Sequence, residues 1–502
     1  AVVHLHQEKQ EGFLDFREVA PRAATADMFV RDGKVVPGLS TDGGLAAGVP
    51  GAVAGYLELH STYGKLKLKD VLAPAIAAAK NGFWVTPDFR DMMRIRLEGL
   101  QADPDLAATF LQRDGSGAWV PKPAGAVLKN PDLAKLLEQI SAKGAKAFYE
   151  GKVAQAIADS ARARGGILTA EDLRAYRARW RDAVEGSYRG HRMLSAGPPS
   201  AGGVALLQVL GVIERTYPFG VSYRDPEGLH VLAEAMRRAY YDRWKYLGDP
   251  AFVPVSLPDL LGAEHLDAMA AGIDHAKATP SAKLLGTVAP APAQAPGPEA
   301  PPSMQKHTSH LSVVDREGNA VGLTTTVNGY FGACVMVKGY GFLLNNQMND
   351  FTAQPGVPNQ DGLMNGENNT VAPGKTPLTS MTPTLVFMRD RPQDVMLVAG
   401  SNGGSTIPTT VAQIVLNVVD AGMDLERALA LGRIHHQMLP DQLWLDQWGL
   451  EPATMAALQQ RGHSLRKVPV WSAPNAVYVS PADGMRYAVS DPRREGAGGG
   501  QD

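Results

Sequence analysis

The sequence predicts a mixed α+β protein, with helices concentrated in its first half and strand pairs in its second half. Three observations support this. Apolar residues recur at helical spacing in several segments between residues 66 and 247. From residue 308 onward, β-branched and apolar runs alternate with turn residues, a pattern typical of hairpins. The 502 residues are 44% hydrophobic and 20% charged, so the chain can bury the core that such a fold needs.

Helical patterns come first along the chain. They cover residues 66–80, 131–144, 153–164, 204–213 and 229–247. Two helix starts are well marked. Asn130 is a preferred N-cap and precedes a proline, and Thr169 with Asp172 has the spacing of a capping box. Residues 188–195 have the composition of a strand.

The clearest change in composition lies at residues 279–306, which are rich in proline and alanine. The centre of this segment has almost no large apolar residue to bury. We therefore expect an exposed, extended or disordered linker. A linker directly before Thr308 would give a proteolytic junction room to separate.

A β-hairpin is predicted directly after the linker. Residues 308–314 and 320–327 have strand composition, and residues 315–319 supply turn chemistry with a glycine. If Val314 or Asp315 pairs with Ala320, antiparallel counting places Thr308 opposite Thr326 or Val327. Two hydroxyl groups would then meet at the open end of the hairpin.

The segments that follow suggest a place for a negative charge. Residues 384–388 and 395–399 are predicted strands, and the second leads through the glycine-rich residues 400–405 into a helix at 409–419. Such a strand, glycine turn and helix start presents free backbone N–H groups to an anion or oxyanion. Residues 352–375 are polar and form a long loop, which makes them a candidate lid.

Composition excludes other classes of function. There are 49 Lys and Arg residues against 51 Asp and Glu, so overall charge does not point to nucleic acid or to an anionic membrane, and a small polar substrate is expected. The single cysteine, Cys334, cannot form an internal disulfide, gives no zinc signature and is expected to pack as a small hydrophobe. Neither a transmembrane run nor the pattern of a signal peptide is present in the given sequence.

Four motifs in this order make the chain resemble the γ-glutamyltransferase family of N-terminal-nucleophile hydrolases. The resemblance extends over nearly the whole chain, from the element at residues 15–21 to residues 490–493. The four motifs are Thr308-Ser309-His310-Leu311-Ser312-Val313-Val314-Asp315, Leu344-Asn345-Asn346-Gln347-Met348-Asn349-Asp350-Phe351, Pro377-Leu378-Thr379-Ser380-Met381 and Gly400-Ser401-Asn402-Gly403-Gly404-Ser405.

The resemblance implies a four-layer αββα sandwich and self-cleavage between His307 and Thr308. Residues 1–307 would form a large subunit that ends in the linker at 279–306, and residues 308–502 a small subunit, the two intertwined as one globular unit. Thr308 would be the nucleophile. Its freed α-amino group, with an ordinary pKa of about 7.7–8.0, would serve as its base. Thr326 would assist, and the backbone N–H groups of Gly403 and Gly404 would stabilise the oxyanion.

The resemblance also implies the pocket for the γ-glutamyl group. Its α-carboxylate would bind Arg17, Thr379 and Ser380. Its α-ammonium would bind Asn328, Gln347 and Asp350.

The expected activity is therefore that of a γ-glutamyltransferase or glutathione hydrolase, a zymogen that cuts itself and passes a γ-glutamyl group to water, an amino acid or a peptide. No metal and no cofactor are expected. Neither a nucleic acid nor a membrane is an expected partner, and a periplasmic or secreted location is implied by the family alone.

One alternative is an acylase of the same family that removes glutaryl groups from cephalosporin-type β-lactams. Another is a silent, uncleaved precursor that acts as a binding module.

The chain departs from the family pattern in three places. Little sequence precedes Arg17, so an N-terminal truncation is expected. Asn402 replaces a proline of many relatives. Asp361 stands where some bacterial relatives have a tyrosine that closes the pocket, so gating is expected to differ.

Overall fold

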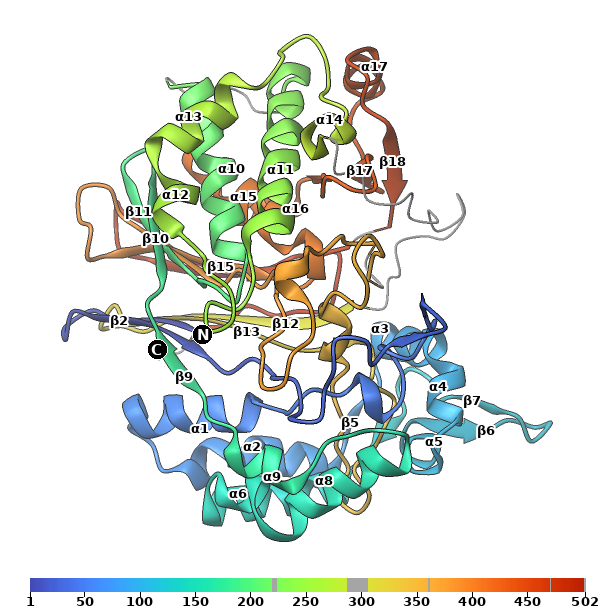
Figure 1. The fold of residues 1–502 in the computed structure, drawn as a ribbon. Helices are drawn as coiled ribbons and strands as arrows, with labels where there is room; N and C mark the ends of the chain where they lie inside the picture. The colour runs from blue at the N-terminus through green and yellow to red at the C-terminus, as the bar shows by residue number, and fades with distance from the viewer. Residues whose placement is uncertain (219–223, 287–305, 360–361, 470, 501–502) are drawn as a thin grey trace.

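The structure is a computed structural model with four stacked layers, in which helices cover the outer faces of two packed β-sheets (Figure 1). It describes residues 1–218, 224–286, 306–359, 362–469 and 471–500, and only the backbone of residues 306 and 307. The predicted four-layer αββα arrangement is confirmed.

The five-stranded sheet combines strands from both sides of Thr308. Its order is β12-β13-β1-β2-β9, and all neighbours are antiparallel. The strands are β1 (Val2–Leu5), β2 (Gln10–Asp15), β9 (Arg179–Arg181), β12 (Lys306–Val314) and β13 (Ala320–Gly329). Because β13 pairs with β1, the residues after Thr308 are hydrogen-bonded to the start of the chain.

The six-stranded sheet packs on the first sheet and is also antiparallel. Its order is β10-β11-β14-β15-β19-β20. The strands are β10 (Val184–Tyr188), β11 (His191–Ser195), β14 (Thr384–Phe387), β15 (Val395–Ser401), β19 (Pro474–Val479) and β20 (Arg486–Ser490). Small apolar and aromatic side chains such as Val2, Phe13, Leu385 and Val398 fill the space between the two sheets.

Helices on the six-stranded sheet form the upper layer of Figure 1. The helices of this half are α10 (Gly202–Thr216), α11 (Pro226–Tyr246), α12 (Leu257–Leu261), α13 (Ala263–Ala271), α14 (Ser281–Leu285), α15 (Ile407–Val419), α16 (Leu425–Ala430) and α17 (Pro452–Gln460). The three longest, α10, α11 and α15, contribute apolar faces to a large core that they form with strands β14 and β15. A three-stranded sheet of β16 (Ile434–His435), β17 (Leu443–Asp446) and β18 (Leu465–Val468) lies beside them.

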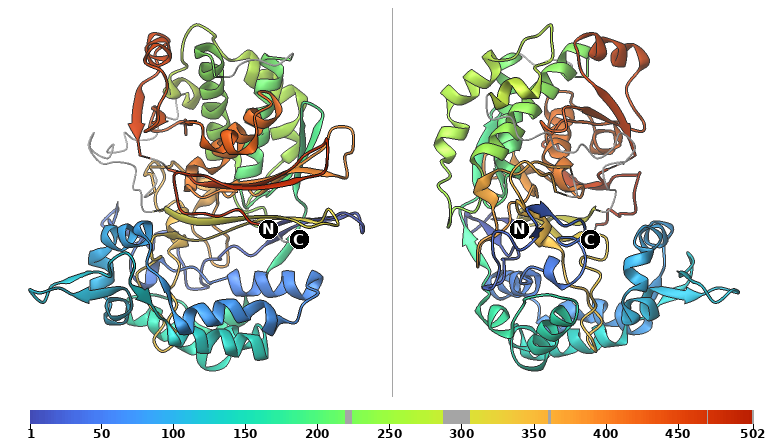
Figure 2. Two further views of the ribbon diagram at one scale, coloured as in Figure 1. Left: turned by 180° about the vertical axis from the view of Figure 1, so that it is seen from behind. Right: turned by 45° about the vertical axis from the view of Figure 1, so that its right-hand side comes forward.

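Helices from the first third of the chain form the lower layer. They are α1 (Ala52–Tyr63), α2 (Leu68–Asn81), α3 (Pro87–Ile95), α4 (Leu97–Gln101), α5 (Pro104–Phe110), α6 (Pro131–Lys143), α7 (Lys146–Tyr149), α8 (Gly151–Ala163) and α9 (Ala170–Ala175). Three short pairs complete it: β3 (Val30–Arg31) with β4 (Lys34–Val35), β5 (Phe83–Trp84) with β8 (Val127–Leu128), and β6 (Leu111–Arg113) with β7 (Trp119–Pro121). Figure 2 shows the segment from α3 to β7 standing out from the body of the molecule.

Most of the predicted elements are confirmed. The Asn130 side chain caps α6, and Thr169 with Asp172 forms the predicted capping box at α9. The hairpin pairs Val314 with Ala320, one of the two registers considered. Within the described ranges, no helix combines the length and the apolar character that crossing a membrane requires.

Two predictions about local structure are wrong. Residues 188–195 are not one strand, because Arg189 and Gly190, both with positive φ, form a tight turn between β10 and β11. The linker at 279–306 is not extended at its start, where α14 begins at the buried Ser281. Leu285 of α14 packs against Tyr240, Leu363 and Met438, so tertiary contacts support this short helix. The alanine- and proline-rich centre of the predicted linker lies outside the described residues.

Candidate active site

Two threonine hydroxyls meet at the open end of the β12–β13 hairpin. Thr308 lies opposite Thr326, and Thr308 Oγ1 donates a hydrogen bond to Thr326 Oγ1 at 3.1 Å. The regular register ends here, because His307 pairs with Asn328 while Thr308 pairs with Thr326. One residue of β13, Val327, is therefore unmatched beside the His307–Thr308 bond, which is the geometry of a β-bulge.

Thr326 is held by two neighbours that the sequence had placed in the same site. Its Oγ1 accepts a hydrogen bond from the backbone N–H of Asn328 at 2.8 Å, and its carbonyl accepts one from Gln347 Nε2 at 3.3 Å. Asn328 has a positive φ of 73°, a conformation that asparagine adopts more readily than most residues. Its Nδ2 donates to the carbonyl of Asn346 at 3.1 Å.

A glycine turn faces this pair from the six-stranded sheet. β15 leads into Gly403 and Gly404, whose φ values are 125° and 56°, and then into the short 3-10 helix η4 (Gly404–Thr406) and helix α15. The left-handed φ values explain why glycines occupy both positions. Backbone N–H groups at such a helix start have no partner within the helix, so they can stabilise an anion.

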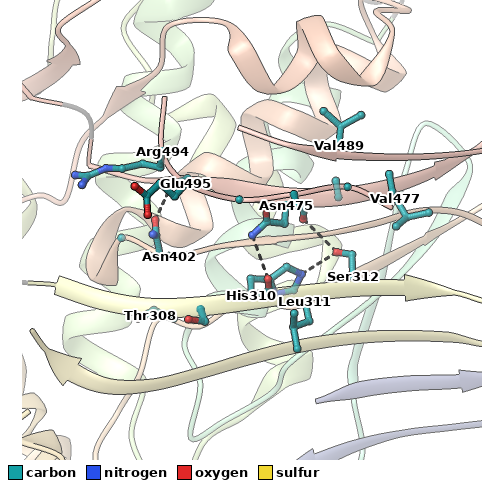
Figure 3. A pocket seen from close by; sticks show the side chains of 18 of the residues that line it. Thr308, His310, Leu311, Ser312, Asn402, Asn475, Val477, Val489, Arg494 and Glu495 are labelled. Carbon is teal, nitrogen blue, oxygen red and sulfur yellow. Dashed lines mark hydrogen bonds between the residues drawn. The ribbon is translucent and has the colours of Figure 1, made fainter. Parts of the chain in front are cut away.

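His310 sets the contact between the nucleophile strand and the glycine strand. It follows Thr308 by two residues on the same face of β12, and a Cβ at Gly400 would lie 2.2 Å from its Cε1. Its Nδ1 lies 2.8 Å from Thr324 Oγ1. Figure 3 shows the contacts on its other side, where its Nε2 lies 2.9 Å from Ser312 Oγ, which in turn donates to the Asn475 carbonyl at 3.1 Å. Burial lowers the pKa of His310 to about 3, so this histidine is a neutral bridge.

Thr308 and the glycine turn line one cavity. Its volume is about 1510 Å³, and its walls include Thr308, Asn402 and Gly403. Figure 3 shows Thr308 on its strand and Asn402 on the opposite side of this cavity. Asn402 is fixed there because its Oδ1 accepts a hydrogen bond from the backbone N–H of Ala473 at 2.6 Å.

The charged residues of the predicted pocket lie on the other side of Thr326. Arg17 and Asp350 form an ion pair, and their side chains are 3% and 15% exposed. Arg17 Nε also donates to the carbonyl of Pro377 at 3.4 Å, which brings it beside the motif that contains Thr379 and Ser380. Arg17, Thr326 and Thr379 line a second, smaller cavity of about 40 Å³. Ser380 is buried, and its carbonyl accepts a hydrogen bond from Thr382 Oγ1.

The predicted lid is better described as a packed support for Asp350. The Nδ2 groups of Asn365 and Asn369 donate to the Asp350 carbonyl at 3.3 and 2.6 Å, and both residues are buried. Asn369 Oδ1 also accepts from the backbone N–H of Leu378 at 2.9 Å. Asp361, the proposed replacement for a gating tyrosine, lies outside the described residues.

Sequence reasoning missed one acidic group in this site. Glu18 is buried next to Arg17, with 4.0 Å between Glu18 Oε2 and Arg17 Nη1. Burial raises the pKa of Glu18 to about 7, against the opposing effect of the Arg17 charge. Its position directly after Arg17 in the motif at residues 15–21 was the available signal. No group of three or more His, Cys, Asp or Glu side chains that could hold a metal ion occurs among the residues that the structure describes.

Comparison with known proteins yields a family model and close relatives. The model described as Gamma-glutamyltranspeptidase matches residues 1–500. The glutathione hydrolase proenzyme of Pseudomonas sp. (strain A14) is 38% identical over 492 residues, which cover 96% of this chain and 82% of that protein.

Two solved structures are also similar. The cephalosporin acylase from Bacillus halodurans superposes with a TM-score of 0.80 at 23% identity, covering 98% of this chain and 84% of that chain. The Helicobacter pylori gamma-glutamyltranspeptidase gives a TM-score of 0.52 at 39% identity, covering 56% of this chain and 80% of that chain.

Proposed function

This chain belongs to the gamma-glutamyltranspeptidase family, and we propose that it is an autoprocessed γ-glutamyltransferase and hydrolase with Thr308 as its nucleophile. The observation that carries the proposal is the pair of hydroxyls at Thr308 and Thr326, of which Thr308 lines one cavity with Gly403. A nucleophile, a hydrogen-bonding neighbour and a glycine turn are the parts that acyl transfer requires.

The first proposed reaction is self-cleavage. Thr308 Oγ1 attacks the carbonyl carbon of His307, the bond from that carbon to the Thr308 nitrogen breaks, and the nitrogen leaves as an amine while the His307 acyl group moves to the hydroxyl oxygen. Water then hydrolyses this ester to a carboxylate. The register shift at His307 and Thr308 supports this step, because the unmatched Val327 of β13 makes the strand ladder irregular beside this peptide bond. Thr326 Oγ1 accepts the hydrogen bond that orients the attacking hydroxyl.

Turnover uses the same atoms with the freed amine as base. The Thr308 amine takes the hydroxyl proton, the oxygen attacks the γ-carbonyl of the substrate, and the proton passes to the leaving amine. The backbone N–H groups of Gly403 and Gly404 stabilise the tetrahedral oxyanion, a contribution of about 3 kcal/mol per donor in comparable sites. Water or the amine of an amino acid or peptide then releases the γ-glutamyl group.

The pocket chemistry favours a substrate end that carries both an ammonium and a carboxylate. Arg17 and Asp350 neutralise each other in the structure, and a zwitterionic α-amino acid end offers each of them a partner of opposite charge. Thr379 and Ser380 would complete the carboxylate site, and Asn328 with Gln347 the ammonium site. In the described part of the chain, the buried Gln347 Oε1 has no hydrogen-bond partner, and an ammonium would supply a donor.

A glutaryl group lacks this ammonium and would leave Gln347 Oε1 unsatisfied, which argues against the acylase alternative. Residues 1–307 and 308–502 would remain associated, because β12 and β13 are paired into the sheet of β1 and β2. Action in the periplasm or outside the cell is part of this proposal and rests on family membership; cell fractionation would test it.

The proposal is tested on the purified chain with a denaturing gel and two chromogenic anilides, one γ-glutamyl and one glutaryl. We expect two bands and preferential release from the γ-glutamyl anilide. Thr308→Ala should leave one band and no turnover. Ser309→Ala is the matched control, because Ser309 is an exposed hydroxyl on the same strand.

Turnover that survives Thr308→Ala would refute the proposed nucleophile. Preference for the glutaryl anilide would support the acylase alternative instead. A parent chain that stays uncut and inactive would favour the silent binding module.

A further inference from the structure

Helix α11 reaches the glycine turn from a part of the chain far away in sequence. The Tyr240 hydroxyl donates a hydrogen bond to the carbonyl oxygen of Ser405, the residue that follows Gly404. Tyr240 is 2% exposed, and its ring stands edge-on to that of His435 at 5.5 Å. Burial raises the pKa of Tyr240, so the hydroxyl keeps its proton and remains a donor.

A second set of contacts from α11 supports the same residue indirectly. Arg237, one turn before Tyr240, pairs with Asp441 and donates to Ser281 Oγ at 2.6 Å. The segment that ends at Asp441 includes Gln437, whose Oε1 accepts a hydrogen bond from Ser405 Oγ at 2.8 Å. The main chain and the side chain of Ser405 are therefore both fixed by hydrogen bonds.

The direction of the Ser405 carbonyl is coupled to the direction of the oxyanion donors. In a helical turn, carbonyl groups point toward the C-terminal end while N–H groups point toward the N-terminal end. Ser405 lies in η4, and the N–H groups of Gly403 and Gly404 lie at its start. A hydrogen bond that fixes the carbonyl of Ser405 therefore also limits rotation of the peptides of Gly403 and Gly404. These glycines adopt positive φ and have no side chain that would restrict them.

We propose that Tyr240 is a positioning residue for the oxyanion turn, which it holds through the Ser405 carbonyl so that the Gly403 and Gly404 N–H groups face Thr308. The proposal rests on the proposed function of the site. Tyr240 does not line either cavity described above, so it acts through the turn and does not contact the substrate. Tyr240 and Ser405 would belong to different fragments after cleavage before Thr308, so one fragment would align the oxyanion donors of the other.

The test compares Tyr240→Phe with Tyr241→Phe, both normalised to the amount of cleaved chain. Tyr241 is the matched control, because it is the next residue of α11, is partly exposed and contacts Lys245 at 3.1 Å. We expect Tyr240→Phe to lower kcat about 10-fold and to change KM less than about twofold, since a misplaced donor weakens only transition-state binding. Tyr241→Phe should match the parent chain.

A second readout separates positioning from general loss of structure. A tetrahedral boronate analogue of the γ-glutamyl group, which occupies the oxyanion turn, should bind Tyr240→Phe about 10-fold more weakly. L-Glutamate, whose side-chain carboxylate carbon is planar and does not mimic the tetrahedral intermediate, should bind equally well to all variants.

Unchanged kcat and boronate affinity in Tyr240→Phe would overturn the proposal, as would parallel losses of boronate and glutamate affinity. If Tyr240→Phe does not fold, Ser405→Ala tests the premise on which the proposal depends, that fixing Ser405 aligns the oxyanion donors. That variant keeps the main-chain carbonyl that Tyr240 contacts and removes the side-chain hydrogen bond to Gln437. It should lower kcat about threefold at constant KM, and an unchanged kcat would overturn this premise and the proposal with it. Thr308→Ala, assayed beside these variants, tests the proposed function separately, because turnover in that variant would contradict the proposed nucleophile whatever the result for Tyr240→Phe.

Discussion

Arg17 and Asp350 form a largely buried ion pair, with side chains 3% and 15% exposed, although 333 positions separate them in the sequence. Arg17 lies two residues after the inner strand β2 of the five-stranded sheet, whereas Asp350 ends the short helix η2 (Gln347–Asp350). Removing one partner of such a pair strongly destabilises the fold, because the other charge remains buried without compensation. The pair therefore links the stability of the fold to the selectivity proposed for the pocket.

Replacing the acid of this pair should change substrate selectivity. In Asp350→Asn the proposed ammonium site loses its charge, and we expect kcat/KM for a γ-glutamyl anilide to fall at least about 100-fold. The value for a glutaryl anilide should fall much less, because a glutaryl group has no ammonium. The ratio of the two kcat/KM values is the measurement, and an unchanged ratio would remove Asp350 from the proposed site.

Removing the neighbouring hydroxyl should slow self-cleavage. Thr326→Val keeps the shape of the side chain but cannot accept the hydrogen bonds from Thr308 and from the Asn328 backbone. We expect cleavage to slow about 10- to 100-fold on a timed denaturing gel, in line with the loss of one catalytic hydrogen bond. Thr326→Ser retains the hydroxyl and should cleave at close to the parent rate. Equal rates for the valine and serine variants would contradict this role.

The buried acid Glu18 should make stability depend on pH. Its pKa is raised to about 7, so the folded chain keeps this proton in a range where the unfolded chain has lost it. The stabilising contribution is complete below about pH 4.5 and is lost as pH rises through about 7. Glu18→Gln removes this loss, so the variant should gain stability relative to the parent chain between pH 5 and pH 8.

This gain should be at most about 3 kcal/mol, because one pKa unit corresponds to about 1.4 kcal/mol. Thermal unfolding of both chains at the two pH values, in the uncleaved Thr308→Ala background, provides the comparison. If the difference in stability between Glu18→Gln and the parent chain is the same at both pH values, the raised pKa of Glu18 is contradicted.

The close contact between β12 and β15 should tolerate no side chain at Gly400. An added Cβ would lie 2.2 Å from the His310 ring, which is hydrogen-bonded at both nitrogens and cannot turn away. Gly400→Ala should therefore lower stability by about 1–3 kcal/mol or more. Gly115→Ala is the control, since no atom lies within 4 Å of a Cβ there. Similar melting temperatures for the two variants would contradict the close packing.

Features with local causes were predictable from the sequence. The register that places Thr308 opposite Thr326 follows from a short turn between two β-branched runs, and the start of α6 follows from a capping asparagine before a proline. The turn at Arg189 and Gly190 escaped prediction because it lacks the Asn-Gly or Asp-Gly signature of tight hairpins.

Features with distant causes were not predictable from the residues alone. Helix α14 begins where Ser281 donates a hydrogen bond to the carbonyl of Met438, a contact that no local pattern encodes. The pairing of Arg17 with Asp350, and the contact of Tyr240 with Ser405, likewise depend on how the layers stack. Family motifs indicated which residues share the site, but not which of them contact one another.

The pairing of β13 with β1 has a consequence for how the molecule is made. Val2 lies opposite Gly322, so the five-stranded sheet cannot close until most of the chain has been synthesised, and its contacts are of the long-range kind that fold slowly. In the uncut chain, this closure is an intramolecular event. Once the bond before Thr308 is cut, reassembly from separated pieces becomes a bimolecular reaction whose rate depends on concentration. Cleavage would therefore remove the intramolecular route to refolding. The cut molecule would then stay folded chiefly because its two fragments dissociate slowly.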